Sequence, residues 1–270
     1  MKRIHSPAAL VLIAAALAAA LSGCPKKQTV VEDGSWTRKV TVGGSGADYE
    51  SISDALDDAE EGWLISIRPG VYDEAVEIET DGVTLRGAGP GKTIIDADDE
   101  YAALTIAADE VVVEGLTLRG AESHGAYVKG EDAVVRRCLI VNNGDRGVYF
   151  SFMDEDVSGA IDHCTVVNND VSGLYIPNQN SSTSVTNCII ARNNRGIVSD
   201  DSDDDEGRGL MKVDYNCLDN DENNYGEVTS GDNDIEGDPK FADPGAGDYT
   251  LKKGSPCIGA ASDGGNIGCF

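Results

Sequence analysis

Four copies of one unit lie in the middle of the chain: VVVEGLTLRGAESHGAYV (111–128), VVRRCLIVNNGDRGVYF (134–150), AIDHCTVVNNDVSGLYI (160–176) and SVTNCIIARNNRGIVS (184–199). They align on one apolar position, occupied by Leu116, Cys138, Cys164 and Cys188, whose spacings are 22, 26 and 24 residues. Eight or nine residues later comes a glycine: Gly125, Gly147, Gly173 and Gly196. A fixed period in this range is typical of stacked structural repeats.

Each unit is predicted to form short β-strands. Apolar and polar residues alternate, Val, Ile and Thr dominate, and Gly, Asn and Asp separate the runs, which is the pattern of strands joined by turns. No helical stripe of ten residues intervenes. We therefore predict an all-β fold, a right-handed parallel β-helix whose coils rise about 4.8 Å each. The alternative is an antiparallel sandwich with chance similarity between the units.

Stacked coils place each residue over its counterpart one coil earlier. The sequence therefore predicts a vertical file of Cys138, Cys164 and Cys188 inside the coils. A second file, at a bend, is predicted for Asn143, Asn169 and Asn193. Inward asparagines are expected to hydrogen-bond each other and the turn backbone, because a buried amide needs partners.

The N-terminus carries the pattern of a secretory signal. Lys2 and Arg3 precede an apolar run over residues 8–20, which is shorter than the ~20 residues that a membrane-spanning helix needs. The next residues, LSGC (21–24), resemble the lipobox of bacterial lipoproteins, which implies a lipid on Cys24 and attachment to a membrane. Pro25 after the cysteine resembles lipoproteins sent to the outer membrane. We expect a signal peptide over 1–23, a tether over 24–36 and one β-helix domain over 37–270.

Composition narrows the classes of partner. The net charge is −27, so binding of nucleic acid through its phosphates is not expected. One domain of this size suffices for a solenoid with a continuous core, and we expect a monomer.

Residues 41–97 open the fold. Within them Ile52, Ala55, Leu56 and Ala59 form a helical stripe after the N-cap candidate Ser51, so we expect a short amphipathic helix that covers the first coil.

Three stretches then carry a family resemblance: GADYESISDALDDA (46–59), IRPGVYDEAVEI (67–78) and LRGAGPGKTIID (85–96). They resemble the start of pectin methylesterases and of the pectin lyase-like superfamily, whose members are right-handed parallel β-helices that often act on acidic polysaccharides. The segment DPKFADPGAGDYTLKKGSPCIGAA (238–261) resembles the closing segment of secreted bacterial β-helix proteins. The catalytic motifs of the esterases are absent, so no catalytic residue is assigned.

Cysteine usage adds two expectations. Cys257 and Cys269 bracket the tail and are candidates for a disulfide in an oxidising compartment. In VDYNCL, Asn216 fits the inward file better than Cys217, which is then expected to face outward. The file cysteines are expected to remain thiols, because their parallel Cβ vectors disfavour a bridge. No CxxC motif occurs and only three histidines are present, which argues against a zinc site.

Two surface rows are candidates for binding. Tyr127, Tyr149 and Tyr175 each lie two residues after a repeat glycine and are expected to face outward. Such a column suits stacking on sugar rings, although mutual stacking that stabilises the sheet is the alternative. Beside them run His124, Arg146, Ser172 and Arg195. Arg146 and Arg195 are candidates for pairing with a carboxylated sugar, and pairing with local acidic side chains is the alternative.

An acidic loop is a candidate calcium site. SDDSDDDEGRG includes Asp201, Asp203 and Asp205, and oxygen-rich clusters suit calcium, although charge runs are usually solvated.

Three functions remain open on these grounds. The first is a lipid-anchored envelope protein whose β-helix surface binds a glycan or another polymer without catalysis. The second is a lyase, esterase or epimerase on uronic-acid polymers, and the third is a structural envelope protein.

Overall fold

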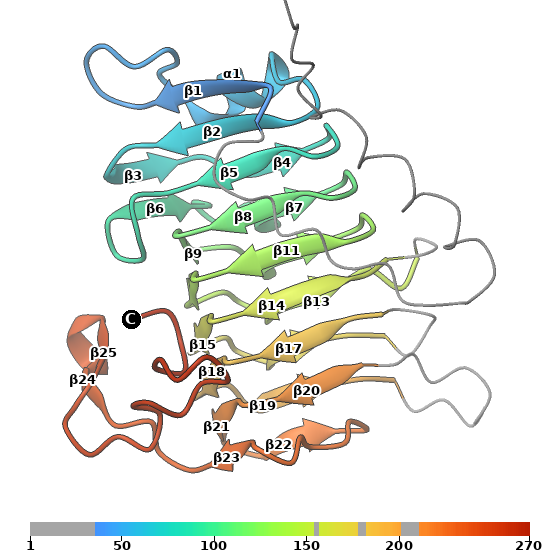
Figure 1. Cartoon of the computed structure of the whole chain (residues 1–270), viewed down its shortest axis with the longest axis vertical. Helices are drawn as coiled ribbons and strands as arrows, with labels where there is room; N and C mark the ends of the chain where they lie inside the picture. Colours follow the sequence, from blue (N-terminus) through green and yellow to red (C-terminus); the bar gives the residue numbers. More distant parts are fainter. Residues whose placement is uncertain (1–35, 154–156, 178–181, 201–210) are drawn as a thin grey trace, which may run out of the picture. The chain divides into compact units, whose positions relative to one another are not determined.

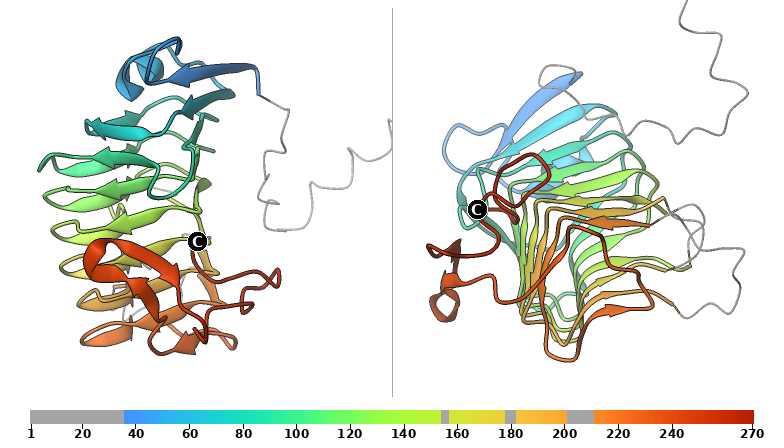
Figure 2. Two further views of the ribbon diagram at one scale, coloured as in Figure 1. Left: turned by 90° about the vertical axis from the view of Figure 1, so that its left-hand side faces the viewer. Right: turned by 60° about the horizontal axis from the view of Figure 1, so that its bottom comes forward.

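The chain winds into a stack of parallel β-coils (Figure 1). The computed structural model describes residues 36–153, 157–177, 182–200 and 211–270, all within one unit of the chain, Asp33–Phe270. Three sheets form the sides of the stack, and the view from its lower end shows them enclosing one interior (Figure 2). Neighbouring strands within these sheets pair in parallel, which rules out the antiparallel sandwich.

The three sheets take their strands in turn from each coil. Sheet A contains, in order, β1 (Arg38–Val42), β2 (Trp63–Ile67), β5 (Thr84–Arg86), β8 (Val112–Glu114), β11 (Ala133–Arg136), β14 (Gly159–Asp162), β17 (Ser184–Thr186) and β20 (Lys212–Asp214). Sheet B contains β3 (Gly70–Asp73), β6 (Thr93–Asp96), β9 (Thr117–Arg119), β12 (Leu139–Val141), β15 (Thr165–Val167), β18 (Ile189–Ala191), β21 (Cys217–Asp219) and β23 (Ile235–Glu236). Sheet C contains β4 (Val76–Ile78), β7 (Ala102–Ile106), β10 (His124–Val128), β13 (Arg146–Phe150), β16 (Ser172–Tyr175), β19 (Arg195–Val198) and β22 (Asn223–Gly226).

Few described residues form other regular structure. The helix α1 (Ile52–Asp57) follows β1, and its Ile52, Ala55 and Leu56 are buried. Ser51 is its N-cap, because the Ser51 hydroxyl accepts a hydrogen bond from the Asp54 N–H. Near the C-terminus an antiparallel pair, β24 (Phe241–Asp243) and β25 (Asp248–Leu251), flanks a 3-10 turn, η1 (Pro244–Ala246). No helix in the described part of the chain has the length and apolar character to cross a membrane.

The predicted cysteine file is confirmed. Cys138, Cys164 and Cys188 are fully buried in one core, and the Cys164 backbone N–H points at the Cys188 sulfur, 3.4 Å away. Asn216 takes the same position in the next coil, where its side-chain oxygen accepts the Cys188 N–H at 3.0 Å. The file therefore ends in an amide, as the VDYNCL pattern predicts.

The asparagine file is also confirmed, and it extends further than predicted. The amide nitrogen of each asparagine donates to the side-chain oxygen of the next at 2.9–3.0 Å, through Asn143, Asn169, Asn193, Asn220 and Asn224. The same oxygens accept backbone N–H groups of the preceding coil, as between Asn143 N and Asn169 Oδ1 at 3.2 Å. Because the side-chain oxygens of Asn169, Asn193, Asn220 and Asn224 each hold two donors, this asparagine ladder satisfies the bends inside a closed core.

The repeat glycines mark the closest approach between coils. A Cβ atom at Gly147 would lie 2.3 Å from a Val166 methyl and 2.7 Å from the carbonyl oxygen of Gly173. Gly125 and Gly173 meet the equivalent atoms of their own neighbouring coils. Real Cβ atoms do not tolerate such distances, so this glycine file sets how tightly the coils stack.

The C-terminal segment covers the outer face of sheet B (Figure 1). A row of this face, Leu139, Ile189 and Cys217, joins the tail residues in a second apolar cluster that includes Phe241, Tyr249, Cys257, Ala261 and Ile267. Cys217 does point away from the interior, as the sequence predicts, but it is fully buried rather than solvent-facing. The reason is that residues far away in sequence fold back over it.

Removing one member of the asparagine ladder should cost more stability than its size suggests. We expect Asn169→Leu to lower the free energy of unfolding by about 2–5 kcal/mol, because two donors of Asn143 lose their acceptor inside the core. Chemical denaturation measures this. Asn223→Leu, at an exposed strand position, is the matched control and should change stability by less than about 0.5 kcal/mol. Equal losses in both variants would contradict the role of the ladder.

Candidate functional site

The two predicted surface rows lie in register on sheet C. Tyr127 pairs with Tyr149, and Tyr149 with Tyr175, on the consecutive strands β10, β13 and β16. The second row pairs, strand by strand, His124, Arg146, Ser172 and Arg195. Their sequence neighbours Ala126, Val148 and Leu174 are fully buried in the core, so the alternation that predicts these rows holds.

The tyrosine rings pack against one another. The ring centroids of Tyr127 and Tyr149 lie 5.3 Å apart with planes 18° from parallel, and those of Tyr149 and Tyr175 lie 5.5 Å apart. Tyr149 is only 8% exposed. Mutual stacking, the alternative raised above, is therefore present, and the ring face of Tyr149 is closed to a ligand.

Arg146 lies across the same rings. Its guanidinium carbon is 5.0 Å from the Tyr149 centroid and 4.8 Å from that of Tyr175, within the range of cation–π contact. The guanidinium also forms an ion pair with the carboxylate of Asp145. A local acidic partner thus neutralises Arg146, which is the alternative to its pairing with a sugar carboxylate. Arg195, partly exposed, stands in the same row beside Ser172.

Tyr101 completes the group and is the residue that the sequence patterns do not reveal. It lies in the turn before β7, outside the repeat, and its hydroxyl is 3.2 Å from Nε2 of His124. Its ring meets those of His124 and Tyr127 edge to face, at 5.2 and 6.0 Å. At 52% exposure it is the most accessible ring of this aromatic cluster, which we define as Tyr101, His124, Tyr127, Tyr149 and Tyr175.

His124 is held neutral. Burial, aided by the nearby positive charge of Arg146, lowers the pKa of its imidazole to about 4. With Nε2 engaged by Tyr101, its Nδ1 lies 4.0 Å from the Asp145 carboxylate, beyond hydrogen-bond distance. Three buried polar atoms of this one row, His124 Nδ1, Arg146 Nε and Ser172 Oγ, have no hydrogen-bond partner among the described residues. Buried polar atoms normally have partners, so the row has unused bonding capacity.

The hydroxyl groups of the tyrosines are anchored to other side chains. Tyr127 donates to the Ser151 hydroxyl at 3.3 Å, and Tyr175 donates to the Asp200 carboxylate. Burial, together with this contact, raises the pKa of Tyr175 well above its usual value. Next to them, Phe152 and Met153 are exposed directly after β13. The cluster thus combines fixed hydroxyl tips with an exposed apolar margin.

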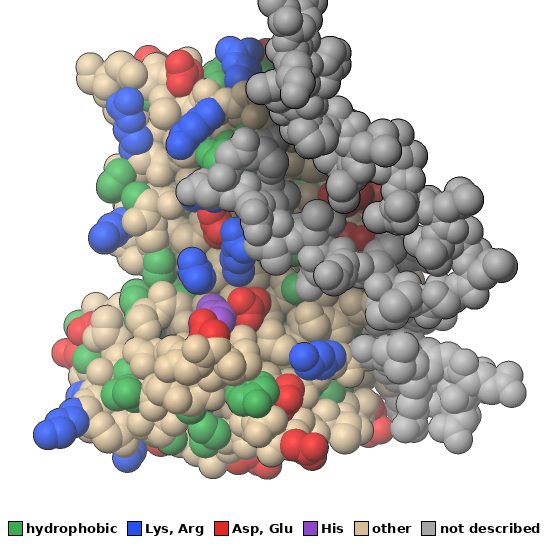
Figure 3. All heavy atoms as spheres, in the orientation of Figure 1, with side chains coloured by type: hydrophobic (Ala, Val, Ile, Leu, Met, Phe, Trp, Pro, Cys, Tyr) green, Lys and Arg blue, Asp and Glu red, His purple; other side chains and the backbone are tan. Residues whose placement is uncertain are grey.

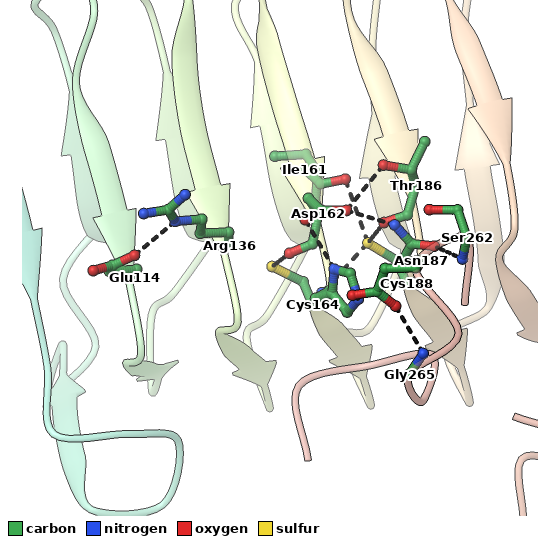
Figure 4. A network of polar contacts seen from close by, with 12 residues as sticks. Glu114, Arg136, Ile161, Asp162, Cys164, Thr186, Asn187, Cys188, Ser262 and Gly265 are labelled. Carbon is green, nitrogen blue, oxygen red and sulfur yellow. Dashed lines mark hydrogen bonds and ion pairs between the residues drawn. The ribbon is translucent and has the colours of Figure 1, made fainter. Parts of the chain in front are cut away.

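A second polar network lies where the C-terminal segment meets the edge of sheet A (Figure 4). The Asp162 carboxylate accepts hydrogen bonds from His163 Nδ1 at 2.8 Å, Thr186 at 3.0 Å and Asn187 at 2.8 Å. His163 Nε2 lies 3.5 Å from Asp263, whose carboxylate also accepts the Gly265 N–H. The hydrogen bond that His163 donates to Asp162 raises the pKa of His163 against the opposing effect of burial. This network ties the tail to the solenoid.

Three arginines of sheets A and B are paired with carboxylates. Figure 3 shows Lys and Arg side chains spread over its upper part and a histidine among acidic side chains lower down. Arg86 and Arg136 both contact the Glu114 carboxylate between them, Arg136 at 2.6 Å. Arg119 pairs with Asp96 at 2.8 Å.

Several predicted site residues do not form the expected site or lie outside it. Cys257 and Cys269 are free thiols in this structure, as are Cys138, Cys164, Cys188 and Cys217, so the disulfide between Cys257 and Cys269 stays a prediction. Cys269 lies against Thr165, to whose hydroxyl its backbone N–H donates at 3.2 Å. Cys24 and the acidic residues Asp201, Asp203 and Asp205 lie outside the described residues. Elsewhere, within the described ranges, no group of three or more His, Cys, Asp or Glu side chains is arranged to hold a metal.

Comparison with known proteins identifies the fold. The family model described as "Right handed beta helix region" matches residues 92–238. No curated protein matches the sequence. A pectin methylesterase from Aspergillus niger superposes with a TM-score of 0.52 at 17% identity, over 71% of this chain and 68% of the esterase.

Two alginate lyases of polysaccharide lyase family 6 are also similar. One, AlyGC, superposes with a TM-score of 0.52 at 18% identity, over 62% of this chain and 27% of the lyase. The other, a mannuronic acid specific enzyme from human gut microbiota, gives 0.54 at 16%, over 74% and 51%. The chain thus spans about a quarter and about half of these two lyases. At such identities the likeness concerns the fold.

The attachment of the tail should depend on pH through His163. Because the pKa of His163 is raised in the folded state, its protonated form stabilises the attached tail. This contribution is complete below the ordinary pKa of 6.5 and is lost as the pH rises through the folded-state pKa. For Asp162, burial opposes ionisation, but hydrogen bonds from His163 and Asn187 lower its pKa, so its contribution is complete above 3.8 and is lost on acidification. The tail should therefore be held most firmly between about pH 4 and 6.5.

We expect His163→Asn to remove the loss of stability above pH 6.5, at a cost of about 0.5–1 kcal/mol below it. Asparagine tolerates the left-handed backbone of this position, where φ is 48°. Hydrogen exchange of residues 238–270 across pH 5–9 measures the effect. An unchanged pH profile in the variant would show that His163 does not control the tail.

Proposed function

This chain belongs to the right-handed β-helix family and has the pectin lyase-like fold, and we propose that it is a bacterial envelope lipoprotein whose sheet C surface binds a polysaccharide. The observation that carries the proposal is the aromatic cluster. It places four tyrosines and a histidine side by side along the solenoid axis, with Tyr101 exposed at its edge. A linear polymer presents repeated groups along its length, and this surface repeats its own groups in the same way.

The cluster offers the contacts that sugars use. A tyrosine has an apolar ring and a polar tip, and such rings suit the mixed apolar and hydroxyl surface of a sugar. Because Tyr149 is closed off by stacking, contact falls to the exposed face of Tyr101 and to the partly exposed Tyr127 and Tyr175. Mutual packing then has a use besides stability, since it fixes the rings before a ligand arrives and lowers the entropy cost of binding.

Charge favours a polymer with few carboxylates at this surface. Arg146 is offset by Asp145, and Asp200 adds another negative charge at Tyr175. The whole chain has a net charge of −27. A heavily carboxylated polymer would meet repulsion there, whereas a hydroxyl-rich one would not.

A second candidate function is polysaccharide cleavage or modification. The contact between Tyr101 and His124 favours it, because a hydroxyl bonded to a neutral imidazole is a pair through which a proton can move. The similar structures named above are an esterase and lyases that act on polysaccharides. In this candidate, Tyr101 would meet the sugar and His124 would position it.

We further infer that α1 closes the N-terminal end of the core, since its buried stripe packs against β1 and β4. Calcium binding by the acidic loop with Asp201, Asp203 and Asp205 stays a prediction. The monomeric state of the protein also stays a prediction.

Tyr101 gives the sharpest test of glycan binding. We expect Tyr101→Ala to weaken binding of the best ligand on a glycan array about tenfold, which corresponds to the loss of one aromatic contact. Val71→Ala is the control, because Val71 is equally exposed, at 53%, on β3 of sheet B. Equal binding by wild type and Tyr101→Ala would refute the proposal.

Incubation of the protein with polysaccharides separates binding from catalysis. Release of shortened, unsaturated or de-esterified products from alginate, pectate or neutral glycans would establish an enzyme, and intact polymer would leave binding. If products form, His124→Gln should abolish their formation while the polymer still binds.

Lipid attachment is tested at Cys24. We expect Cys24→Ala to shift the protein from the membrane to the soluble fraction and to abolish labelling by a fatty-acid analogue, because the lipid supplies the anchor. Cys269→Ser is the matched control and should remain in the membrane fraction. Membrane retention of Cys24→Ala would contradict the anchor.

A further inference from the structure

Two thiols meet where the C-terminal segment lies on sheet B. Cys217 in β21 points out of the solenoid, and Cys257 belongs to the segment that covers it. Neither thiol is exposed to solvent, and both belong to the same apolar cluster. Each thiol shifts the pKa of the other, upward for Cys217 and downward for Cys257, as expected for two side chains that lie close together.

We propose that Cys217 and Cys257 form a disulfide in the mature protein and that this bond fastens the C-terminal segment to the solenoid. The proposal replaces the pairing of Cys257 with Cys269 and does not depend on what the sheet C surface binds.

The direction of the two side chains suits a disulfide. A bridge requires Cβ vectors that point toward each other. Cys217 and Cys257 come from two layers packed face to face, which gives that arrangement. The file of Cys138, Cys164 and Cys188 differs, because these residues lie on stacked coils and point the same way into the core.

Cys269 is too far from Cys217 to pair with it. Its backbone is bonded to Thr165, which lies two strands from Cys217 through Ile189. Two strand spacings are about 10 Å, beyond the Cα separation that a disulfide spans. The close packing of Gly268 on Thr165 and Ile189 holds this end of the tail in place.

The chemistry is a thiol–disulfide exchange. The attacking group is the Cys257 thiolate, because a thiolate and not a thiol is the nucleophile in this exchange. That thiolate attacks the disulfide of a dithiol–disulfide oxidoreductase, forms a mixed disulfide and expels one enzyme thiolate. Cys217, as a thiolate, then attacks the Cys257 sulfur, so one S–S bond forms in the chain. The two thiol protons pass to solvent or to the enzyme, and the oxidoreductase disulfide takes up the two electrons. Exchange takes place before the tail has closed over the pair.

The bond would close a loop of 40 residues. It would hold the C-terminal segment over the apolar row of sheet B, since Leu139 and Ile189 depend on this segment for burial.

Peptide mapping tests the proposal directly. The full chain, exported through its own signal and purified without reductant, is denatured, alkylated and digested. We expect one linked peptide that joins Cys217 to Cys257, with Cys138, Cys164, Cys188 and Cys269 alkylated. Alkylation of both Cys217 and Cys257, or a link from Cys257 to Cys269, would overturn the proposal.

Thermal unfolding provides a second measurement. Cys217→Ser, Cys257→Ser and the double variant should share one Tm, about 5–15 °C below that of wild type. A reductant should lower the wild-type Tm to the same value and leave the variants unchanged. Cys269→Ser is the matched control and should keep both the linked peptide and the response to reductant. A wild-type Tm that is insensitive to reductant would contradict the bond. If a variant fails to fold, the peptide map of the wild type decides.

Discussion

The asparagine ladder is the interaction on which the rest of the structure depends. Its amides join the bends of successive coils from Asn143 to Asn220, and Asn224 of the same coil as Asn220 ends it; each oxygen also holds a backbone N–H. A strand that slipped by one residue would turn its side chains to the opposite face, so a bonded bend in each coil of the ladder fixes which residues face the core. The tyrosine and histidine rows of sheet C are in register for this reason. Surface chemistry here follows from a constraint inside the core.

Sheet C shows how such stacking changes the chemistry of ordinary residues. His124 lies between Tyr101, in the turn before β7, and Arg146 on β13, and burial there keeps it neutral. Arg146, placed over two rings, is matched by the acidic residue next to it. The result is a rigid surface that is rich in aromatic rings, with polar atoms beneath it that have no partner.

The sequence predicts what the repeat controls. The cysteine file, the asparagine file and both rows of sheet C follow from spacing alone, because stacked coils bring equal positions together. What it misses comes from outside the repeat. Tyr101 lies in a turn, and its contact with His124 has no spacing to reveal it. The burial of Cys217 and the partner of Cys257 depend on a tail that folds back over sheet B. The burial of Tyr149 depends on the packing of its neighbouring rings, and the alternation of inward and outward positions does not predict that packing.

The glycine file has a consequence for how such a molecule changes over evolution. At Gly125, Gly147 and Gly173 the space for a side chain is taken by atoms of the adjoining coil and by no more distant part of the solenoid. Each coil is therefore fitted to its immediate neighbours alone. Duplication or excision of a whole coil re-creates the same fit at the new junction, whereas gain or loss of part of a coil does not. Relatives should accordingly differ in length by complete windings, with the variable segments emerging at the corners.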